Sequence, residues 1–297
     1  MGYSKTIAAI LVIGTTMALA AFAVRQCLCT RDSSPQILIP SPRIVSLAPN
    51  LTEILFALGL GDHLAAVTSN CDYPPAVADK PRMGSFWQPD IETILAARPE
   101  LLVALDIPQH QAIVSRFRQQ GCICLSLQID TLDQLAPAIR EIASATGRTL
   151  EGEAVIQDIY NRIKSFPLSP GYARPKVLWV IQRDPLRVAG TKTFISELLG
   201  LAGGANAIGP TIYEYPPIGA EELLAAAPEV IIEPSDNPDP SELKSQADFW
   251  SRYPALPAMQ HHRLYLIPSA IVSRVGPRIP DALAEIANRI HPPAAQP

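Results

Sequence analysis

Three aromatic residues lie in proline-rich segments, where loops are expected, and could supply flat contact surfaces for a ligand. Tyr73 belongs to the segment D-Y-P-P, Trp87 to W-Q-P-D, and Tyr215 to E-Y-P-P. Stiff aromatic rings contribute large contact areas at a low entropy cost, although an aromatic residue in a loop often packs locally instead. The matched segments around Tyr73 and Tyr215 favour binding, because a cleft between two lobes needs a wall from each lobe.

Two glutamates could provide a second kind of contact. Glu92 and Glu221 both fall in the first turn of a short predicted helix. A carboxylate there interacts favourably with the helix dipole, by about 0.3–1 kcal/mol, and this interaction alone would explain both residues. The functional alternative is a pair of acidic docking points, one on each lobe, that bind arginines of a partner protein.

The sequence predicts no catalytic residue and no metal site. It contains no G-x-S-x-G, no H-E-x-x-H and no phosphate-binding P-loop. The five histidines are scattered, and no cysteine pair stands at zinc-binding spacing. Cys122 and Cys124 lie on a predicted strand and should share one face as small buried residues. A disulfide involving Cys71 remains open, as does a hydrolase that uses carboxylates with a metal.

The elements that must position these residues alternate between strands and helices. The strands of the first half are apolar on both faces, which is typical of a parallel sheet covered by helices. Asn50 or Thr52 is expected to cap the first helix. In order, the first half is predicted to contain strand 43–47, helix 53–58, strand 64–68, helix 92–98, strand 101–105, helix 109–120 and strand 122–127.

Two helices without a strand follow, over about 132–166, and Gly147 separates them. The second helix would connect two lobes or would pack on one lobe only. A second series of elements then begins. It is predicted to contain strand 176–181, a loop over 183–192, helix 193–200, helix 220–227, strand 230–233, a helix or turn over 249–259, strand 263–267 and helix 281–290.

Three sequence echoes indicate that the second half repeats the plan of the first. The D-Y-P-P segment returns 142 positions later as E-Y-P-P, and the stretch that begins at Glu92 returns 129 positions later at Glu221. Glu53-Ile54-Leu55 returns 144 positions later as Glu197-Leu198-Leu199. The unequal offsets indicate loops of different length. We therefore predict two Rossmann-like α/β lobes, 33–147 and 171–297, joined by a long helix within 148–170.

The N-terminal 32 residues are predicted to stand apart from this fold. Residues 7–24 carry no charge, which fits a secretory signal peptide or a membrane anchor. Lipoprotein processing at Cys27 or Cys29 is disfavoured, because small residues do not precede them. Both alternatives imply export to the periplasm or to the outer face of the cytoplasmic membrane. The net charge of −4 and the lack of a basic stripe argue against nucleic-acid binding.

The motifs in combination resemble the helical-backbone metal-receptor family, the exported substrate-binding proteins of ABC importers for cobalamin, haem and ferric siderophores. The resemblance covers residues 42–291 and is strongest to the cobalamin-binding branch. It rests on the segments PRIVSLAPNLTEILFALGLGD, CDYPP, WQPDIETILAARPELLV, AGTKTFISELLGLAGGANAI, YPPIGAEELLAAAPEVII and GPRIPDAL. It implies a class III periplasmic-binding-protein fold and a monomeric, non-enzymatic receptor without an intrinsic cofactor.

The resemblance also assigns roles to residues. It implies that Tyr73, Trp87 and Tyr215 contact a corrinoid, and that Glu92 and Glu221 form salt bridges to the permease, which works with ATPase subunits. Where cobalamin binders place an aromatic residue, this chain has Leu186-Arg187-Val188.

Arg187 could instead bind a propionate, a phosphate or a siderophore carboxylate. Haem and ferric siderophores therefore remain alternative ligands. A membrane-anchored sensor is a further alternative if residues 1–24 are retained.

Overall fold

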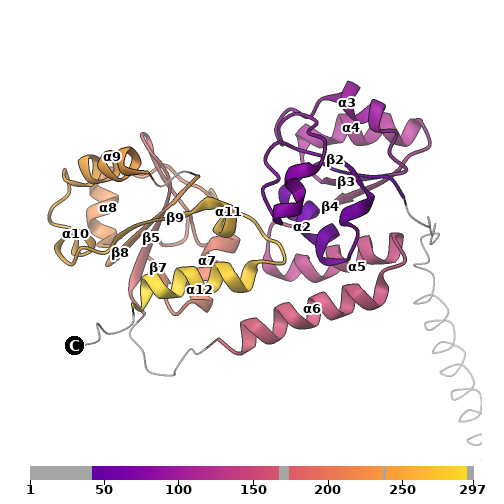
Figure 1. Cartoon of the computed structure of the whole chain (residues 1–297). Helices are drawn as coiled ribbons and strands as arrows, with labels where there is room; N and C mark the ends of the chain where they lie inside the picture. Colours follow the sequence, from indigo (N-terminus) through magenta and orange to yellow (C-terminus); the bar gives the residue numbers. More distant parts are fainter. Residues whose placement is uncertain (1–41, 167–173, 237–238, 293–297) are drawn as a thin grey trace, which may run out of the picture. The chain divides into compact units, whose positions relative to one another are not determined.

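Two sheets of mainly parallel strands organise the part of the chain that the computed structural model describes, residues 42–166, 174–236 and 239–292 (Figure 1). The first sheet has the order β2-β1-β3-β4, and all its pairings are parallel. Its strands are almost wholly apolar, because helices cover both faces. They are β1 (Ile44–Ser46), β2 (Leu64–Val67), β3 (Leu101–Leu105) and β4 (Ile123–Leu127).

The helices of the first lobe are α2 (Pro49–Ala57), α3 (Ile91–Ala97), α4 (Pro108–Gln119), α5 (Leu135–Ala145) and α6 (Thr149–Lys164). The predicted cap of α2 was wrong, since the helix begins at Pro49, directly after Ala48. Proline suits the first helical position, where a backbone N–H would have no partner. Asn50 lies inside the helix, and its side-chain amide donates a hydrogen bond to the carbonyl oxygen of Val275, 3.0 Å away.

The break between α5 and α6 occurs at Gly147, as predicted, where the backbone adopts φ +69°. Glycine has no Cβ that would oppose this left-handed conformation. Helix α6 contacts α5 of the first lobe and also α12 (Ile279–Ile290), which covers the second sheet. The helix therefore does not pack on one lobe only.

The second sheet has the order β6-β5-β8-β9, with β7 also paired to β5. Its strands are β5 (Lys176–Arg183), β6 (Leu186–Val188), β7 (Ala205–Asn206), β8 (Val230–Ser235) and β9 (Leu264–Pro268). β6 runs antiparallel to β5 in the segment that the sequence predicted as a loop, so that prediction was wrong there. A tight reversal at Asp184-Pro185 allows the chain to pair back on β5, and period-2 alternation over three residues is too short to show in the sequence.

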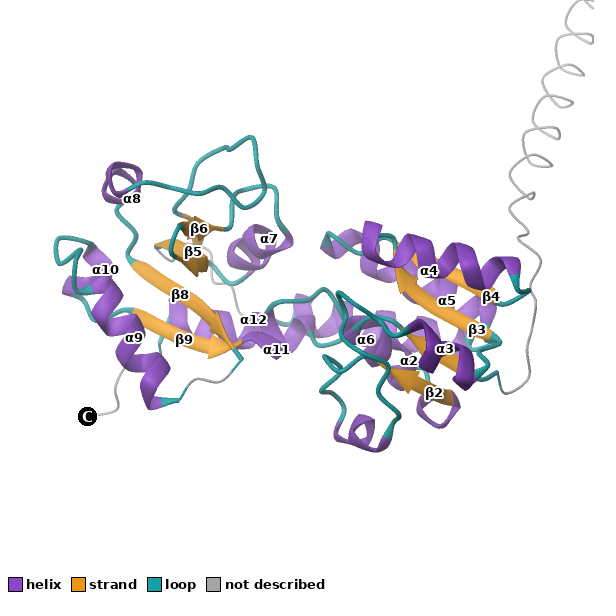
Figure 2. Cartoon of the chain, turned by 90° about the horizontal axis from the view of Figure 1, so that it is seen from above, coloured by secondary structure: helices purple, strands orange, loops and turns teal. Residues whose placement is uncertain are grey.

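The helices of the second lobe are α7 (Phe194–Leu201), α8 (Ala220–Ala226), α9 (Pro240–Trp250), α10 (Pro257–Gln260), α11 (Ser269–Val272) and α12. Most of helix α9 was missed, because the sequence predicted a helix or turn only from residue 249 onward. Its first turn is stabilised by Asp239, whose carboxylate accepts hydrogen bonds from the backbone N–H groups of Ser241 and Glu242. Figure 2 shows the helices of each lobe beside its strands.

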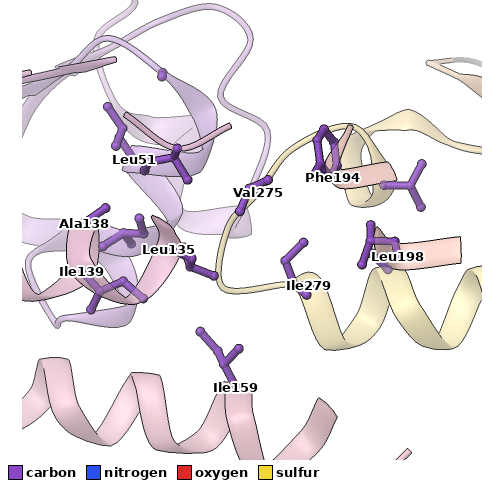
Figure 3. Close-up of a cluster of buried hydrophobic side chains, with 14 of the residues drawn as sticks. Leu51, Leu135, Ala138, Ile139, Ile159, Phe194, Leu198, Val275 and Ile279 are labelled. Atoms are coloured by element: carbon purple, nitrogen blue, oxygen red, sulfur yellow. The ribbon is translucent and has the colours of Figure 1, made fainter. Parts of the chain in front are cut away.

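The largest hydrophobic core draws residues from both lobes (Figure 3). Leu51 and Ile139 of the first lobe belong to the same cluster as Leu198 and Ile279 of the second, and Val275 is also a member. Two smaller cores fill the other face of each sheet. Apolar packing thus continues from one lobe into the next.

The predicted repeat is visible in two backbone features. Helices α3 and α8 both end in a left-handed residue, Arg98 at φ 47° and Ala227 at φ 46°. In each lobe, the first glutamate after this helix forms a hydrogen bond that links the start of the next strand to the start of a neighbouring strand. Glu100 accepts a hydrogen bond from the backbone N–H of Arg43 at 2.9 Å, and Glu229 accepts one from that of Lys176 at 2.8 Å.

Within the described ranges, no helix is both long enough and apolar enough to cross a membrane. The predicted signal peptide or anchor, residues 1–32, lies outside these ranges. So do 33–41 and 167–173, which include part of the predicted connecting segment.

Candidate functional site

A cavity of about 500 Å³ lies where the loops of the two lobes meet. Several of its lining residues follow strands: Asp236 and Ser269 stand directly after β8 and β9, and Asp130 stands three residues after the end of β4. Open parallel sheets bind ligands at this edge, beyond the carboxyl ends of their strands. Trp87 lines the cavity from the first lobe and Tyr215 from the second, so the structure brings these two predicted residues to one cavity.

Trp87 is 62% exposed, and its loop is held from beneath by Phe86. The rings of Phe86 and Trp87 meet edge to face with centroids 4.8 Å apart. The backbone N–H of Phe86 donates to the side-chain oxygen of Asn70 at 2.8 Å. Its carbonyl oxygen lies 3.0 Å from Nε2 of His110. The exposed indole is therefore presented by a loop whose backbone is fixed on both sides.

His110 is fully buried beneath this loop. Burial lowers the pKa of His110, because the charged imidazolium loses its hydration. The ring is therefore neutral near neutral pH, with its proton on Nε2 facing the carbonyl oxygen of Phe86. His110 was not singled out from the sequence, and in the structure it supports the Trp87 loop.

Tyr215 is half-buried, and strand β6 fixes the backbone around it. The N–H of Val188 donates to the carbonyl oxygen of Pro216 at 3.2 Å, and the N–H of Gly190 donates to that of Glu214 at 2.7 Å. Burial raises the pKa of Tyr215, and the negative charges of Glu214 and Asp130 raise it further. The phenol therefore keeps its proton and can donate a hydrogen bond into the cavity.

Five charged residues line the cavity, and acidic groups outnumber basic ones. The carboxylates belong to Asp130, Glu214 and Asp236, and the cations to Lys192 and Arg274. The charge of Arg274 is already engaged, because its guanidinium lies 2.9 Å from Asp72 and 3.4 Å from Glu53.

Glu53 is almost fully buried and joins the lobes. Its carboxylate accepts two hydrogen bonds from the guanidinium of Arg278, at 2.6 and 3.0 Å. Burial raises the pKa of Glu53, and the contact with Arg278 opposes that rise. Since Glu53 lies on α2 and both arginines lie between α11 and α12, this ion cluster links the first lobe to the second beside the cavity.

Tyr73 does not line the cavity that contains Trp87 and Tyr215. It lines a second cavity of about 570 Å³, where the guanidinium carbon of Arg278 lies 4.2 Å from the centre of its ring. The matched sequences fold differently at this point. After Tyr73 the chain forms the 3₁₀-helix Pro75–Asp79, whereas the segment after Tyr215 pairs with β6. The role of Tyr73 as a ligand contact stays a prediction.

Arg187 also lies outside the cavity lining. It is exposed on β6, and its guanidinium donates to the carbonyl oxygen of Tyr215 at 3.3 Å. Glu92 and Glu221 are exposed in the first turns of α3 and α8, as expected. Asp90 caps α3 by accepting a hydrogen bond from the backbone N–H of Glu92. No ion pair is found for either glutamate among the described residues.

Several residues at this site were not identified from the sequence, notably Asn70, Lys192, Arg274 and Glu53. Asn70 could have been noted because it stands three residues before Tyr73 in the same loop. Arg274 and Arg278 flank a Gly-Pro pair in the motif SRVGPRI, and two arginines so close together in an acidic protein call for carboxylate partners. Nothing in the sequence pairs them with Glu53, which lies 221 positions before Arg274.

A ligand cavity between two α/β lobes defines a binding protein, and comparison with known proteins agrees. The chain belongs to the periplasmic binding protein family, whose model matches residues 44–271. This family groups binding proteins of transporters rather than enzymes.

The chain is similar to the vitamin B12-binding protein of Vibrio cholerae serotype O1, with 27% identity over 249 residues, which cover 83% of this chain and 88% of that protein. It is also similar to an uncharacterized ABC transporter substrate-binding lipoprotein of Bacillus subtilis, with 24% identity over 84% of this chain and 80% of that one.

Solved structures show the same fold. The periplasmic vitamin B12-binding protein BtuF of Vibrio cholerae superposes with a TM-score of 0.68 and 25% identity, over 85% of this chain and 98% of that chain. The periplasmic haem-binding protein RhuT from Roseiflexus sp. RS-1 gives a TM-score of 0.72 and 26% identity, over 84% and 97%. The expected two-lobe α/β fold is confirmed.

Proposed function

We propose that this chain is the extracytoplasmic substrate-binding protein of an ABC importer and that it binds cobalamin or a related corrinoid. The observation that carries the proposal is the pair Trp87 and Tyr215, which reach one cavity from opposite lobes. A flat macrocycle needs aromatic walls on both sides and a few polar contacts at its rim. The relatives that are named vitamin B12-binding proteins support this ligand class.

The charges of the cavity favour a corrinoid over haem. Haem carries two propionate carboxylates, whereas the corrin rim of cobalamin carries neutral amides. Three carboxylates line the cavity, and Arg274 is already paired, so Lys192 is the cation left to meet an anionic ligand from the lining. Carboxylates repel propionates but accept hydrogen bonds from amide N–H groups. The protonated phenol of Tyr215 suits an amide oxygen better than it suits ferric iron, which prefers a phenolate.

A haem or ferric siderophore receptor is the second candidate function. The exposed guanidinium of Arg187, beside the backbone of Tyr215, favours it, because this group could bind a carboxylate at the cavity mouth. Tyr73 would join the site in either case only if a ligand extended to the second cavity.

Titration calorimetry with cyanocobalamin, haemin and a ferric siderophore tests these alternatives. We expect cobalamin to bind with a Kd of about 1 µM or tighter. Binding of haemin or siderophore without cobalamin would assign the chain to the iron carriers and direct attention to Arg187. Conversion of the ligand, or no binding of any of the three, would contradict the receptor function and favour an enzyme or a sensor.

We further propose that Glu92 and Glu221 dock the loaded receptor onto the permease. Both carboxylates are exposed, and both stand in the first turn of helices that end in the same way. Arginines on the permease would pair with them, and the fixed spacing of the two lobes would make such a two-point contact selective.

We place the receptor outside the cytoplasmic membrane, as a monomer, with residues 1–32 as its export signal or anchor. On this proposal 33–147 and 171–297 form the lobes and 148–170 includes the connecting helix. N-terminal sequencing of the exported protein tests the first part. A start beyond residue 24 would show cleavage, and an intact N-terminus would show an anchor.

A further inference from the structure

An apolar cavity distinct from the ligand cavity lies among helices of both lobes, and we call it the interhelix cavity. It has a volume of about 320 Å³ and is lined by residues of α5, α6, α7 and α12 and of the 3₁₀-helix Leu132–Gln134. In Figure 3, Ile159 points from α6 toward Leu135 and Ile279, which belong to other walls. The interhelix cavity shares no lining residue with the ligand cavity.

The walls of the interhelix cavity are mostly aliphatic. They include Ile139, Ile156, Ile159 and Ile279, all of which are buried. A cavity of about 150 Å³ with walls of this kind stays free of water and binds benzene, so one of about 320 Å³ has room for about ten carbon atoms. Aliphatic walls offer water no hydrogen-bond partner, and the space therefore suits an alkyl chain.

The charged residues of the lining are both acidic. Asp133 and Glu197 are exposed, which places them where the cavity meets solvent. The carboxylate of Glu197 accepts a hydrogen bond from the backbone N–H of Leu132 at 3.3 Å, which holds it close to the residue that precedes Asp133. Among the described residues, the lining contains no lysine, arginine or histidine, and no salt bridge is found for either carboxylate. A ligand should therefore carry a positive charge beside its aliphatic part, because these carboxylates would repel an anion.

We propose that the interhelix cavity binds an aliphatic ammonium ion. Its alkyl chain lies between α5 and α6, and its nitrogen lies at Asp133 and Glu197. An ammonium group has three N–H donors, which are enough for both carboxylates. This site is separate from the ligand cavity and does not depend on the proposed transport function.

Titration calorimetry of the full chain with n-octylammonium at neutral pH tests the proposal. Octanoate has the same chain length with a negative head, and octanol has a neutral head, so the three probes separate the charge from the chain. We expect n-octylammonium to bind with a Kd of about 100 µM or tighter. Octanoate should bind at least about tenfold more weakly. Absence of n-octylammonium binding, or equal affinity for octanoate, would overturn the proposal.

Two amide substitutions test the role of the carboxylates. Asp133→Asn/Glu197→Gln keeps the shapes of both side chains and removes their charges, so it should weaken n-octylammonium binding about tenfold and leave octanol binding unchanged. Glu222→Gln is the matched control, because it neutralises an exposed glutamate on α8 that lines none of the cavities described. The control should bind like the parent protein, and an unchanged affinity in the double variant would contradict the assignment.

A larger side chain inside the cavity tests where the alkyl chain lies. Ala136 is buried and lines the cavity, so Ala136→Leu should weaken n-octylammonium binding about tenfold or more without lowering the free energy of unfolding, since it fills a void. Photolabelling of the parent protein with an alkylammonium that carries a diazirine at its tail locates the chain even where a variant does not fold. Labels are expected in peptides from α5 and α6. Labels confined to the loops of the ligand cavity, or full affinity in a folded Ala136→Leu variant, would refute this location.

Discussion

Replacement of Trp87 by alanine tests the ligand cavity most directly. The residue is 62% exposed, and a large aromatic side chain buries up to about 250 Å² when it is fully covered. A ligand that covered the whole exposed part would therefore remove about 150 Å² from water. At about 25 cal/mol per Å², this area corresponds to a ceiling of ~4 kcal/mol. A planar ligand stacks on one face of the indole and leaves the other in water, so about half of this value should be realised.

Trp87→Ala should therefore weaken cobalamin binding by ~2 kcal/mol, or about 30-fold in Kd. Titration calorimetry measures this difference. The matched control is Tyr160→Ala, which removes an aromatic residue that is 53% exposed on α6 but does not line the ligand cavity. The control should bind like the parent protein. Urea denaturation of both variants should show little loss of stability, because neither ring is buried.

The reasoning would be refuted if Trp87→Ala bound cobalamin within about twofold of the parent, a difference of only ~0.4 kcal/mol. Trp87 would then be a surface residue that the ligand does not cover. An equal loss in Trp87→Ala and Tyr160→Ala would contradict the cavity assignment in another way, since it would indicate a general effect on folding.

Changes at three other places test the supporting structure and the docking proposal. Burial lowers the pKa of His110, so the unfolded chain takes up the proton first as the pH falls below about 6.5. Urea denaturation should therefore show the free energy of unfolding falling from about pH 7 to about pH 5, and falling less steeply in His110→Gln. Equal slopes in the two proteins would exclude this role. Gly84→Ala should cost about 3 kcal/mol of unfolding free energy, because its Cβ would lie 2.6 Å from a backbone oxygen. Gly121 has nearly the same positive φ but open space around it, so Gly121→Ala should cost about 1 kcal/mol. Equal costs would show that the clash at Gly84 relaxes. The double variant Glu92→Ala/Glu221→Ala should keep its ligand affinity and lose most cobalamin uptake by cells, and normal uptake would rule out docking through these residues.

Local sequence patterns predicted most of the elements, because each pattern has a local physical cause. The strand at Leu101–Leu105 is apolar on both faces, as a central parallel strand must be. Helix α3 begins after the cap Asp90 and ends before Pro99. The stripe of Ala136, Ile139 and Ile142 is buried at helical spacing. In these places propensity, capping and burial all favour the same structure.

The errors occurred where distant contacts decide the structure. The three residues of β6 form a strand only because β5 lies beside them. Asn50 looked like a helix cap, but its amide binds Val275, 225 positions later. The different places of Tyr73 and Tyr215 have the same origin. Their sequences match, yet Arg278 covers one ring and β6 holds the backbone around the other.

The candidate site was predictable only in its aromatic part. Trp87 and Tyr215 stood out because large aromatic rings in predicted loops offer contact area to a ligand. The charged residues of the cavity did not, since isolated acidic and basic residues in loops are common. Their importance depends on which carboxylates face which cations, and that is set by the meeting of two lobes rather than by any segment of sequence.

The glutamate ties at Glu100 and Glu229 have a consequence for how such a receptor can evolve. Each tie holds the end of a helix–strand unit to the neighbouring strand through a backbone N–H, so it places no demand on the loops at the opposite edge of the sheet. The loops that carry Trp87 and Tyr215 can therefore change composition while the C-terminal ends of α3 and α8 keep their places. Selection for a new ligand can act on these loops while the joins between helix and strand at Glu100 and Glu229 stay intact. The fold could in this way acquire a new cargo without rebuilding its sheets.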